Sequence, residues 1–481
     1  MKLFFVLTLS ALSFIRPLSA QQLDSILPVF RLQGSLTDST SFILTASDYN
    51  LWQGLSAKYA SSIQIIDAAN PWPPRWFATA PIDSNMKRNN LQSIPVINAS
   101  EQNGKIVFTN AIFRKYPGGQ VKGQQAVLMC NRNLELTDTF YKPGLEIDVH
   151  DFAVNNKGEK LYFLVCDTIV DIRDFMKDAA DSEVSISYEK IQIDNSTNET
   201  IFSWNPIEHL GLNAMYQPYC FEKSVINKSV NFEWSHANSL CWDKDGNILY
   251  SFKYIGIGKI SRADGHTIWR VDRNKQKAGA GSDSLPIFLQ HDLNFVKEDK
   301  LKSTYTVLSN GDSLNPHCTA YQFTVLEDKE DPHLKIVRSF NSPEIPQTGA
   351  GNYDVEANGN YVINYGLYRG DTQSMHVLFD YRAKDDKLWG RYVVLPQAFC
   401  YRIHRFTGPV PSRPEIVEKK GVLVAKDESK TGVWYELSGK DLEAVTKVSA
   451  ARKFKPLHKG YYSLVVKDGI GYVVSKPFKY E

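Results

Sequence analysis

Short apolar runs recur along this chain, and each ends in a turn rich in glycine, asparagine or aspartate. Within the runs, apolar and polar residues alternate with a period of two, which is typical of half-buried β-strands, whereas helical periodicity is scarce. Pairs such as Asp245-Gly246 and Asn358-Gly359 accept the positive φ that tight hairpin turns need. The pattern therefore predicts an all-β protein built from hairpins.

One repeated unit is an apolar strand that ends near a polar residue, followed after a turn by a strand that carries a tryptophan. Its four copies run from Asp67 to Trp76, from Asp194 to Trp204, from Ser261 to Trp269 and from Asp380 to Trp389. Similar spacing in four places is the signature of a repeat architecture. We expect each copy to be the outer hairpin of a repeated four-stranded sheet.

A second repeated unit begins at a polar residue and runs through an apolar strand and a turn into another apolar strand. The first residue is His150, His236 or His291 in three copies and Asn352 in a fourth. Alternating the two units gives four-stranded sheets, and a ring of such sheets is a β-propeller with a central channel. If the copies are its blades, the three imidazoles converge on that channel, where they are suited to nucleophilic and acid–base chemistry near neutral pH.

The 481 residues divide into three predicted parts. Lys2, the apolar residues 3–14 and the small-residue pattern that ends at Ala20 predict a signal peptide over residues 1–20 and therefore export. That apolar stretch is shorter than a bilayer-spanning helix, and no later stretch is long enough. Prolines near residue 409 separate a predicted propeller of residues 21–408 from a small C-terminal β-sandwich-like domain of residues 409–481. We expect residues 175–189 to form an irregular surface insertion.

Composition narrows the class of partner. The formal net charge is +2 with acids and bases mixed, and no basic tract is present, so nucleic acid is not expected to bind. The six cysteines lack the spacing of a zinc site and are expected to be small buried side chains. No glycine-rich loop opens a helix, so nucleotide-dependent chemistry is not expected, and we predict neither a cofactor nor a metal.

Several short motifs, in order along the chain, resemble those of the arylsulfate sulfotransferases, also called arylsulfotransferases, which are secreted or periplasmic enzymes. They are His-Asp-Phe at 150–152, Ser-His-Ala-Asn-Ser at 235–239, Ile-Trp-Arg at 268–270, Gln-His at 290–291 and Phe-Cys-Tyr-Arg at 399–402. The resemblance covers most of residues 60–406. It implies a six-bladed β-propeller that transfers a sulfuryl group from an aryl sulfate to a phenolic acceptor without a nucleotide.

The resemblance also implies a role for each histidine. His291 corresponds to the nucleophile that forms a sulfohistidine, and His150 and His236 correspond to donors or general acids. The arginine that the family places after the second histidine motif is Lys253 here, which keeps the charge but loses the planar fork of guanidinium. Its neighbour, a histidine in the family, is Tyr254, and we expect Tyr254 and Asn238 to contact the substrate.

Other interpretations stay open at this point. A histidine at the start of a strand is often structural, and three imidazoles are able to bind zinc. A propeller that has lost turnover would bind an anionic or aromatic ligand, and a structural surface protein would use its C-terminal domain for attachment. We expect Arg402 to pair with an acid and His404 to line a channel mouth or face solvent. The sequence indicates no oligomeric state.

Overall fold

The computed structural model describes residues 31–33, 40–48, 62–69, 73–79, 91–94, 98–115, 121–171, 183–215, 232–300, 302–311, 316–327, 331–344, 349–369, 375–395, 398–438, 444–468 and 471–481. Within these ranges the protein is all-β, as predicted, apart from the short helix α4 (Pro206–Leu210) and the 3-10 turn η2 (Leu212–Ala214). No helix among these ranges is both long and apolar enough to cross a membrane. The predicted signal peptide, residues 1–20, lies outside them.

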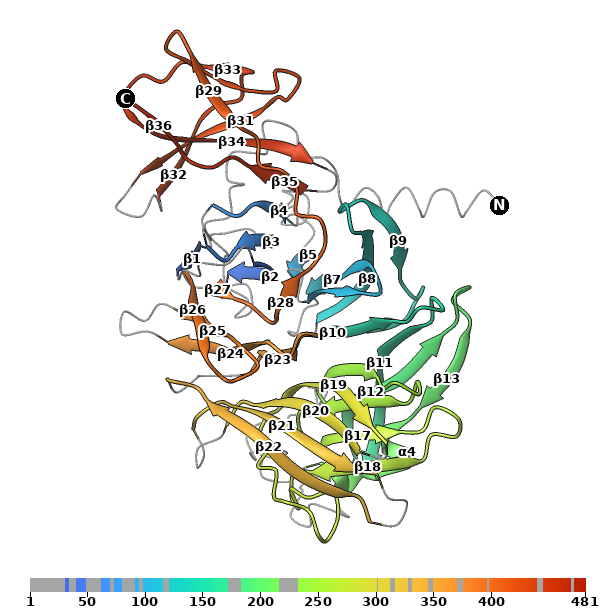
Figure 1. Ribbon diagram of the computed structural model, residues 1–481. Helices are drawn as coiled ribbons and strands as arrows, with labels where there is room; N and C mark the ends of the chain where they lie inside the picture. Colours follow the sequence, from blue (N-terminus) through green and yellow to red (C-terminus); the bar gives the residue numbers. More distant parts are fainter. Residues whose placement is uncertain are drawn as a thin grey trace.

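Three consecutive sheets in the middle of the chain each contain four antiparallel strands in chain order (Figure 1). The first is β10 (Glu146–Val154), β11 (Lys160–Asp171), β12 (Glu183–Asp194) and β13 (Thr200–Trp204), with β14 (Phe232–Glu233) parallel to β12. The second is β15 (Ala237–Trp242), β16 (Ile248–Phe252), β17 (Gly256–Ile260) and β18 (Thr267–Asp272). The third is β19 (His291–Asp299), β20 (Lys302–Ser309), β21 (Thr319–Leu326) and β22 (His333–Asn341).

Two flanking sheets follow the same plan with an added strand. One contains β6 (Ala99–Gln102), β7 (Lys105–Lys115), β8 (Val121–Asn131) and β9 (Leu136–Phe140), and β5 (Leu91–Ile94) pairs with the far half of β7. The other contains β23 (Asn352–Val355), β24 (Tyr361–Arg369), β25 (Met375–Arg382) and β26 (Leu388–Leu395), extended by β1 (Arg31–Gln33).

A further sheet joins segments from the two ends of the repeat region. It contains β2 (Ser41–Asp48), β3 (Ser62–Asp67) and β4 (Trp76–Thr79), while β27 (Ala398–Phe399) and β28 (Ile403–Phe406) pair along the free edge of β2. In Figure 1 the blue β2 therefore lies beside the orange β27 and β28. Ser41 lies opposite Phe406, so backbone hydrogen bonds tie the start of this region to its end.

The C-terminal strands form the red part of Figure 1. One sheet contains β29 (Ile416–Lys419), β30 (Val422–Ala425) and β33 (Lys453–Phe454), and the other strands are β31 (Gly432–Ser438), β32 (Ala444–Ser449), β34 (Gly460–Asp468), β35 (Gly471–Val474) and β36 (Phe478–Tyr480). β35 pairs with β4, where Val473 lies opposite Trp76. Trp434 and Leu464 share one buried cluster with Trp76, so the C-terminal strands and the first sheet have a continuous core.

Both predicted repeats are confirmed as hairpins. The tryptophan unit forms β3–β4, β12–β13, β17–β18 and β25–β26, and the second unit forms β10–β11, β15–β16, β19–β20 and β23–β24. The predicted irregular insertion is wrong for residues 183–189, which lie in β12. Val184, Ile186 and Tyr188 alternate as buried positions there, so the strand period was present in the sequence and was overlooked.

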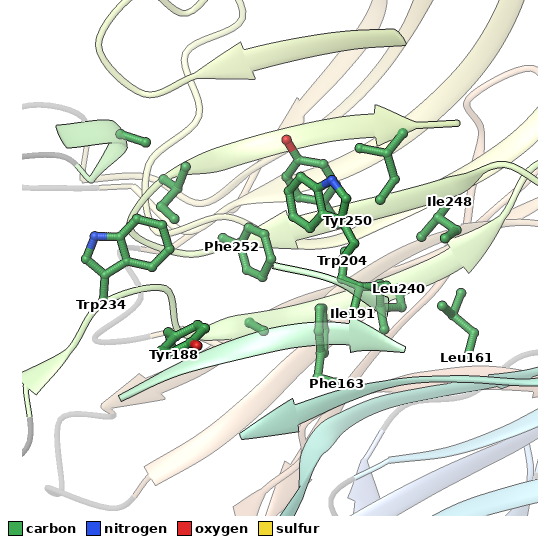
Figure 2. Close-up of a cluster of buried hydrophobic side chains, with 14 of the residues drawn as sticks. Leu161, Phe163, Tyr188, Ile191, Trp204, Trp234, Leu240, Ile248, Tyr250 and Phe252 are labelled. Atoms are coloured by element: carbon green, nitrogen blue, oxygen red, sulfur yellow. The ribbon is translucent and has the colours of Figure 1, made fainter. Parts of the chain in front are cut away.

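The repeated tryptophans fill the space between neighbouring sheets. Trp204 is fully buried and its ring centroid lies 5.5 Å from that of Tyr250 and 6.4 Å from that of Phe252, both in the next sheet (Figure 2). Its indole Nε1 donates a hydrogen bond to the carbonyl oxygen of Gly265, which satisfies the one polar atom of the buried ring. Trp389 departs from this pattern, because it lies on β26 with 39% of its surface exposed.

Four polar side chains near the first strand of a sheet form hydrogen bonds with the backbone of the sheet that follows. In each case a side-chain oxygen accepts a hydrogen bond from a backbone N–H. The side chains are those of Asp151, Ser239, Asp292 and Asn352, and the N–H groups are those of Leu240, Leu293, Tyr353 and Ile403, in the same order. Neighbouring contacts also join β10 to β7 and β8, and β28 to β6. The strand β28 therefore contacts both the sheet that contains Asn352 and the sheet that contains β6.

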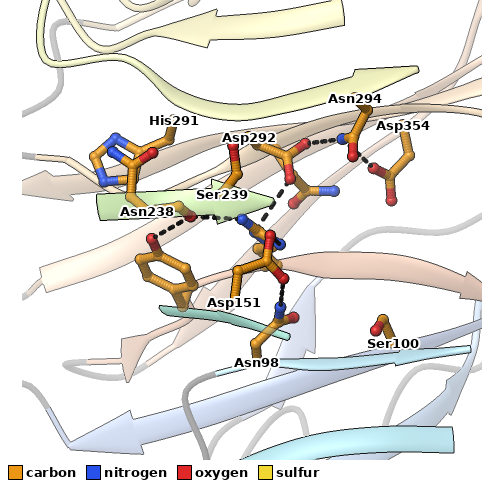
Figure 3. A network of polar contacts seen from close by, with 12 residues as sticks. Asn98, Ser100, Asp151, Asn238, Ser239, His291, Asp292, Asn294 and Asp354 are labelled. Carbon is orange, nitrogen blue, oxygen red and sulfur yellow. Dashed lines mark hydrogen bonds and ion pairs between the residues drawn. The ribbon is translucent and has the colours of Figure 1, made fainter. Parts of the chain in front are cut away.

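Figure 3 shows Asp151, Asn238 and Asp292 of this polar network, and all three contact Arg402. Its guanidinium forms ion pairs of 3.1 Å with both Asp151 and Asp292, and it donates to the carbonyl oxygen of Asn238 at 2.8 Å. All three charged side chains are buried. The predicted pairing of Arg402 with an acid is confirmed. His404 is partly buried, and its Nδ1 contacts the carboxylate of Asp354.

Replacing Arg402 by methionine should lower the free energy of unfolding by about 3–5 kcal/mol, because two buried carboxylates lose their counter-charge. Denaturant unfolding at neutral pH measures the effect. Arg452→Met is the matched control: Arg452 is half exposed and lies 4.0 Å from Glu428, so its loss should cost less than about 1 kcal/mol. Equal effects of the two substitutions would contradict a central role for Arg402.

Candidate functional site

The three predicted histidines come from three successive sheets and lie close together. His150 is in β10, His236 directly precedes β15, and His291 is the first residue of β19. The ring centroids of His150 and His236 are 5.2 Å apart, and the ring of Tyr401 lies 5.4 Å from His150 and 5.9 Å from His291. The structure therefore brings the imidazoles together, with Tyr401 between His150 and His291, although they are far apart in sequence.

His150 is paired with a carboxylate on its own strand. Its Nδ1 lies 2.8 Å from Oδ1 of Asp148, which also accepts the backbone N–H of His150. Burial alone would lower the pKa of His150, but the negative charges of Asp148, Glu233 and Glu189 outweigh it and raise the pKa. His150 therefore holds a proton to higher pH than an ordinary histidine.

His236 occupies a left-handed backbone conformation with φ +49°, which is uncommon for a residue other than glycine. Its Nδ1 lies 2.6 Å from the carboxylate of Glu233. Burial lowers the pKa of His236, and the positive charge of Lys253 adds to this effect, while Glu233 acts in the opposite direction. The result is a lowered pKa, so His236 is predominantly neutral where His150 is still protonated.

Glu189, which sequence reasoning missed, contacts the residues on both sides of His236. The carboxylate of Glu189 accepts a hydrogen bond from the hydroxyl of Ser235 at 2.5 Å and another from the N–H of Ala237 at 3.0 Å. Burial, together with the charges of Asp148 and Glu233, raises the pKa of Glu189. These contacts hold the left-handed turn that presents the imidazole of His236.

No carboxylate of the described residues pairs with His291. Its Nδ1 lies 2.6 Å from Oδ1 of Asn310 and 2.9 Å from the carbonyl oxygen of Leu289. Burial lowers the pKa of His291 well below its ordinary value, and the positive charge of Lys253 lowers it further. His291 is thus a neutral imidazole near neutral pH, which is the form that acts as a nucleophile.

Lys253 lies across the β15–β16 hairpin from His236, since its backbone N–H donates to the carbonyl oxygen of His236. Its ammonium lies 5.3 Å from the centre of the Tyr254 ring and has no hydrogen bond or ion pair with any other described residue. Burial lowers the pKa of Lys253, Glu233 raises it, and the buried Arg273 lowers it again. Lys253 and Arg273 therefore both place positive charge near the site.

The two predicted substrate contacts are placed differently. The ring of Tyr254 lies 5.5 Å from that of His236, at the same cluster. Asn238 is fully buried, and its side-chain NH₂ donates to the carbonyl oxygen of Gln290, directly before His291, at 2.6 Å. Asn238 thus supports the backbone that carries His291, and no contact in the structure tests whether it also meets a substrate.

The sequence reasoning missed four further residues of this cluster besides Glu189. They are Asp148, Glu233, Asn310 and Tyr401. Asp148 lies two residues before His150, and Glu233 lies three residues before His236. An acid shortly before these two histidines was therefore an available signal. Asn310 belongs to an Asn-Gly turn, and Tyr401 stands in the motif that closes the repeat region. Within the described ranges, no group of three or more His, Cys, Asp or Glu side chains is arranged to hold a metal ion.

Fold and site together define an all-β protein of antiparallel sheets with a cluster of three histidines, of which His291 is buried and His150 and His236 are partly buried. Residues 135–369 match the model of the arylsulfotransferase (ASST) family, and this segment contains His150, His236, Lys253 and His291. The family relationship predicted from the motifs is confirmed over these residues, and it supports an arylsulfotransferase-like enzyme. No curated protein matches the chain in sequence.

Solved structures give only distant likenesses. A protein of unknown function from Dyadobacter fermentans DSM 18053 is 8% identical with a TM-score of 0.37, and the match covers 80% of this chain and 99% of that one. A glucose dehydrogenase is 11% identical with a TM-score of 0.28 over 76% and 98% of the two chains. A glycoside hydrolase of family 32 from Bifidobacterium adolescentis is 8% identical with a TM-score of 0.26 over 94% of each chain. TM-scores this low carry no argument about fold or function.

Replacing Asp148 by asparagine should lower the pKa of His150, because the nearest negative charge that holds its proton is removed. In the native protein His150 loses its proton at a higher pH than an ordinary histidine, and in the variant this loss should move to lower pH. The measurement is an NMR titration of the imidazole resonances. Asp264→Asn, which removes the partner of the exposed His266, should leave His150 unchanged. An unmoved titration of His150 in Asp148→Asn would show that the contact does not set its proton affinity.

Proposed function

We propose that this protein transfers a sulfuryl group from an aryl sulfate to a phenolic acceptor, without a nucleotide, at the cluster of His150, His236 and His291. The observation that carries the proposal is the convergence of these imidazoles, from three sheets, beside the partly buried Lys253. The match of residues 135–369 to the arylsulfotransferase family supports the same reaction.

In the first half-reaction His291 is the nucleophile. The lone pair of its imidazole attacks the sulfur of the aryl sulfate, a nitrogen–sulfur bond forms, and the bond between sulfur and the aryl oxygen breaks. The leaving phenolate takes a proton from a second histidine. His150 suits this donor role best because its pKa is raised, and a positioned general acid contributes about 10²–10⁴-fold.

In the second half-reaction the roles reverse. The acceptor phenol gives its proton to His150, which is now neutral, and the phenol oxygen attacks the sulfur. The nitrogen–sulfur bond breaks and His291 returns to its neutral form. His236 lies beside His150 and hydrogen-bonds to Glu233, so we assign it as the second donor at the reacting oxygens.

Lys253 serves as the anchor of the sulfuryl oxygens. Lys253 is partly buried and its ammonium has no hydrogen-bonding partner among the described residues, so it is available to an anion. Fixed positive charge is most effective where water is excluded. The single ammonium replaces the bidentate guanidinium of the family, and it contacts the oxygens as a point charge rather than as a fork.

The sheet arrangement suits a ring around this site. We assign residues 21–408 to a six-bladed β-propeller, in which β28 completes the sheet of β2–β4, and residues 409–481 to a C-terminal β domain. The sheet-to-sheet contacts that return from β28 to β6 support this assignment. Export through a signal peptide of residues 1–20 belongs to the same proposal.

A chromogenic aryl sulfate with excess phenol tests the activity directly. We expect phenol-dependent release of the chromophore, and His291→Ala should reduce it by about 10³-fold or more, because the attacking atom is lost. His266→Ala, a substitution of an exposed histidine, is the matched control and should have little effect. Release that survives His291→Ala would refute the assignment of the nucleophile. Tight binding of aryl sulfate without turnover in the unaltered protein would instead favour a binding propeller.

Lys253→Met should lower kcat by about 10²–10³-fold, because the charge that stabilises the developing anion is removed. Lys253→Arg should retain most of the activity, since it restores a cation with more donors at the same place. Steady-state kinetics on both variants measure this. Equal losses in the two variants would argue that packing, rather than charge, is what Lys253 supplies.

A further inference from the structure

The hydrogen-bond partners of His291 determine which ring nitrogen carries its proton. Both atoms within hydrogen-bonding distance of Nδ1 are oxygens, namely Oδ1 of Asn310 and the carbonyl oxygen of Leu289. An oxygen of either kind accepts a hydrogen bond, so Nδ1 must donate. In a neutral imidazole only one nitrogen carries hydrogen, and therefore Nε2 keeps a free lone pair.

The orientation of the Asn310 amide follows from its other contact. Its Nδ2 donates to the carbonyl oxygen of Ala350 at 2.7 Å. Rotating the amide by half a turn would place its oxygen against the Ala350 oxygen and its NH₂ against the proton of Nδ1. Only one orientation satisfies both neighbours, so the carbonyl of Ala350 turns the amide oxygen of Asn310 toward Nδ1, where it accepts alongside the carbonyl oxygen of Leu289.

The backbone around this contact is strained in a consistent way. Leu289 has φ +47° and Ala350 has φ +112°, and neither residue favours positive φ. A Cβ added at Gly349 would lie 2.5 Å from Cε1 of His291, so the glycine backbone packs directly against the ring. Strain of this kind persists only where surrounding contacts enforce it and often marks a functional position.

The partners of the three histidines differ in charge. His150 and His236 each pair with a carboxylate, whereas His291 pairs with a neutral amide. A carboxylate stabilises the imidazolium and suits a histidine that gives and takes protons, while an amide fixes the tautomer without holding a second proton.

We propose that Asn310 is a positioning residue that, through the carbonyl of Ala350, holds His291 as the Nδ1–H tautomer and so presents Nε2 as the attacking atom. This inference rests on the proposed role of His291 as nucleophile. Asn310 itself touches no reacting atom in this scheme.

Nitrogen-15 NMR of the imidazoles in the full chain tests the contact without any activity. The unaltered protein should show His291 as the Nδ1–H tautomer. In Asn310→Leu the Nε2–H tautomer should become populated, and kcat should fall by about 10–100-fold with KM little changed, a loss typical of removing an orienting partner. Asn98→Leu, which removes another buried asparagine of the central network, is the control and should leave the His291 tautomer unchanged.

Asn310→Asp keeps the size of the side chain and provides a second, independent readout. Its carboxylate should raise the pKa of His291, because a negative charge stabilises the imidazolium. In the unaltered protein burial, the positive charge of Lys253, and the neighbouring His236 and His150 lower this pKa, and the ring of Tyr401 packs beside His291. Because the protonated imidazole does not attack, the acid limb of the pH–rate profile should move to higher pH.

Two results would overturn the positioning role. One is an Nε2–H tautomer in the unaltered protein, and the other is an unchanged tautomer in Asn310→Leu together with an unmoved pH profile in Asn310→Asp. If instead the tautomer responds as expected but no phenol-dependent release occurs, the contact stands and the proposed function fails.

Discussion

Two buried carboxylates, Asp151 and Asp292, share the single guanidinium of Arg402, and the rest of the architecture depends on this arrangement. Leaving any of these charges unpaired inside the protein would cost several kcal/mol. The pairing therefore requires β10, β19 and the segment before β28 to meet, although they are far apart in sequence. Each aspartate directly follows a histidine of the site, so the same constraint fixes the backbone that carries His150 and His291.

Around that centre the protein gives three chemically identical side chains different proton affinities. Carboxylates surround His150 and raise its pKa, whereas burial and the ammonium of Lys253 lower those of His236 and His291. Acid–base chemistry needs one group that holds a proton and another that does not under the same conditions. The environment of each ring, rather than its chemical type, makes such a division of labour possible.

The site also has a cost in backbone conformation. His236, Leu289, Asp292 and Ala350 all have positive φ, and each such residue costs on the order of 1–3 kcal/mol. Contacts from other sheets or strands hold some of these turns, as Glu189 does on both sides of His236. The repeated β-sheet thus serves as a rigid support, and these four residues lie near the ends of its strands.

The sequence by itself determined the all-β class, both repeated hairpins and the three histidines, because period-two alternation, turn residues and short motifs are local properties of the chain. It also indicated that Arg402 pairs with an acid, but not which acid. Residues 183–189 show that even a local signal is missed when a neighbouring segment looks irregular. Only the tertiary structure decided that Glu189, Asn310 and Tyr401 join the cluster. It alone also decided which histidine has a raised pKa and which histidines have a lowered one. Those properties depend on burial and on charges brought close in space from distant segments, and Coulomb interactions follow distance in space rather than distance along the chain.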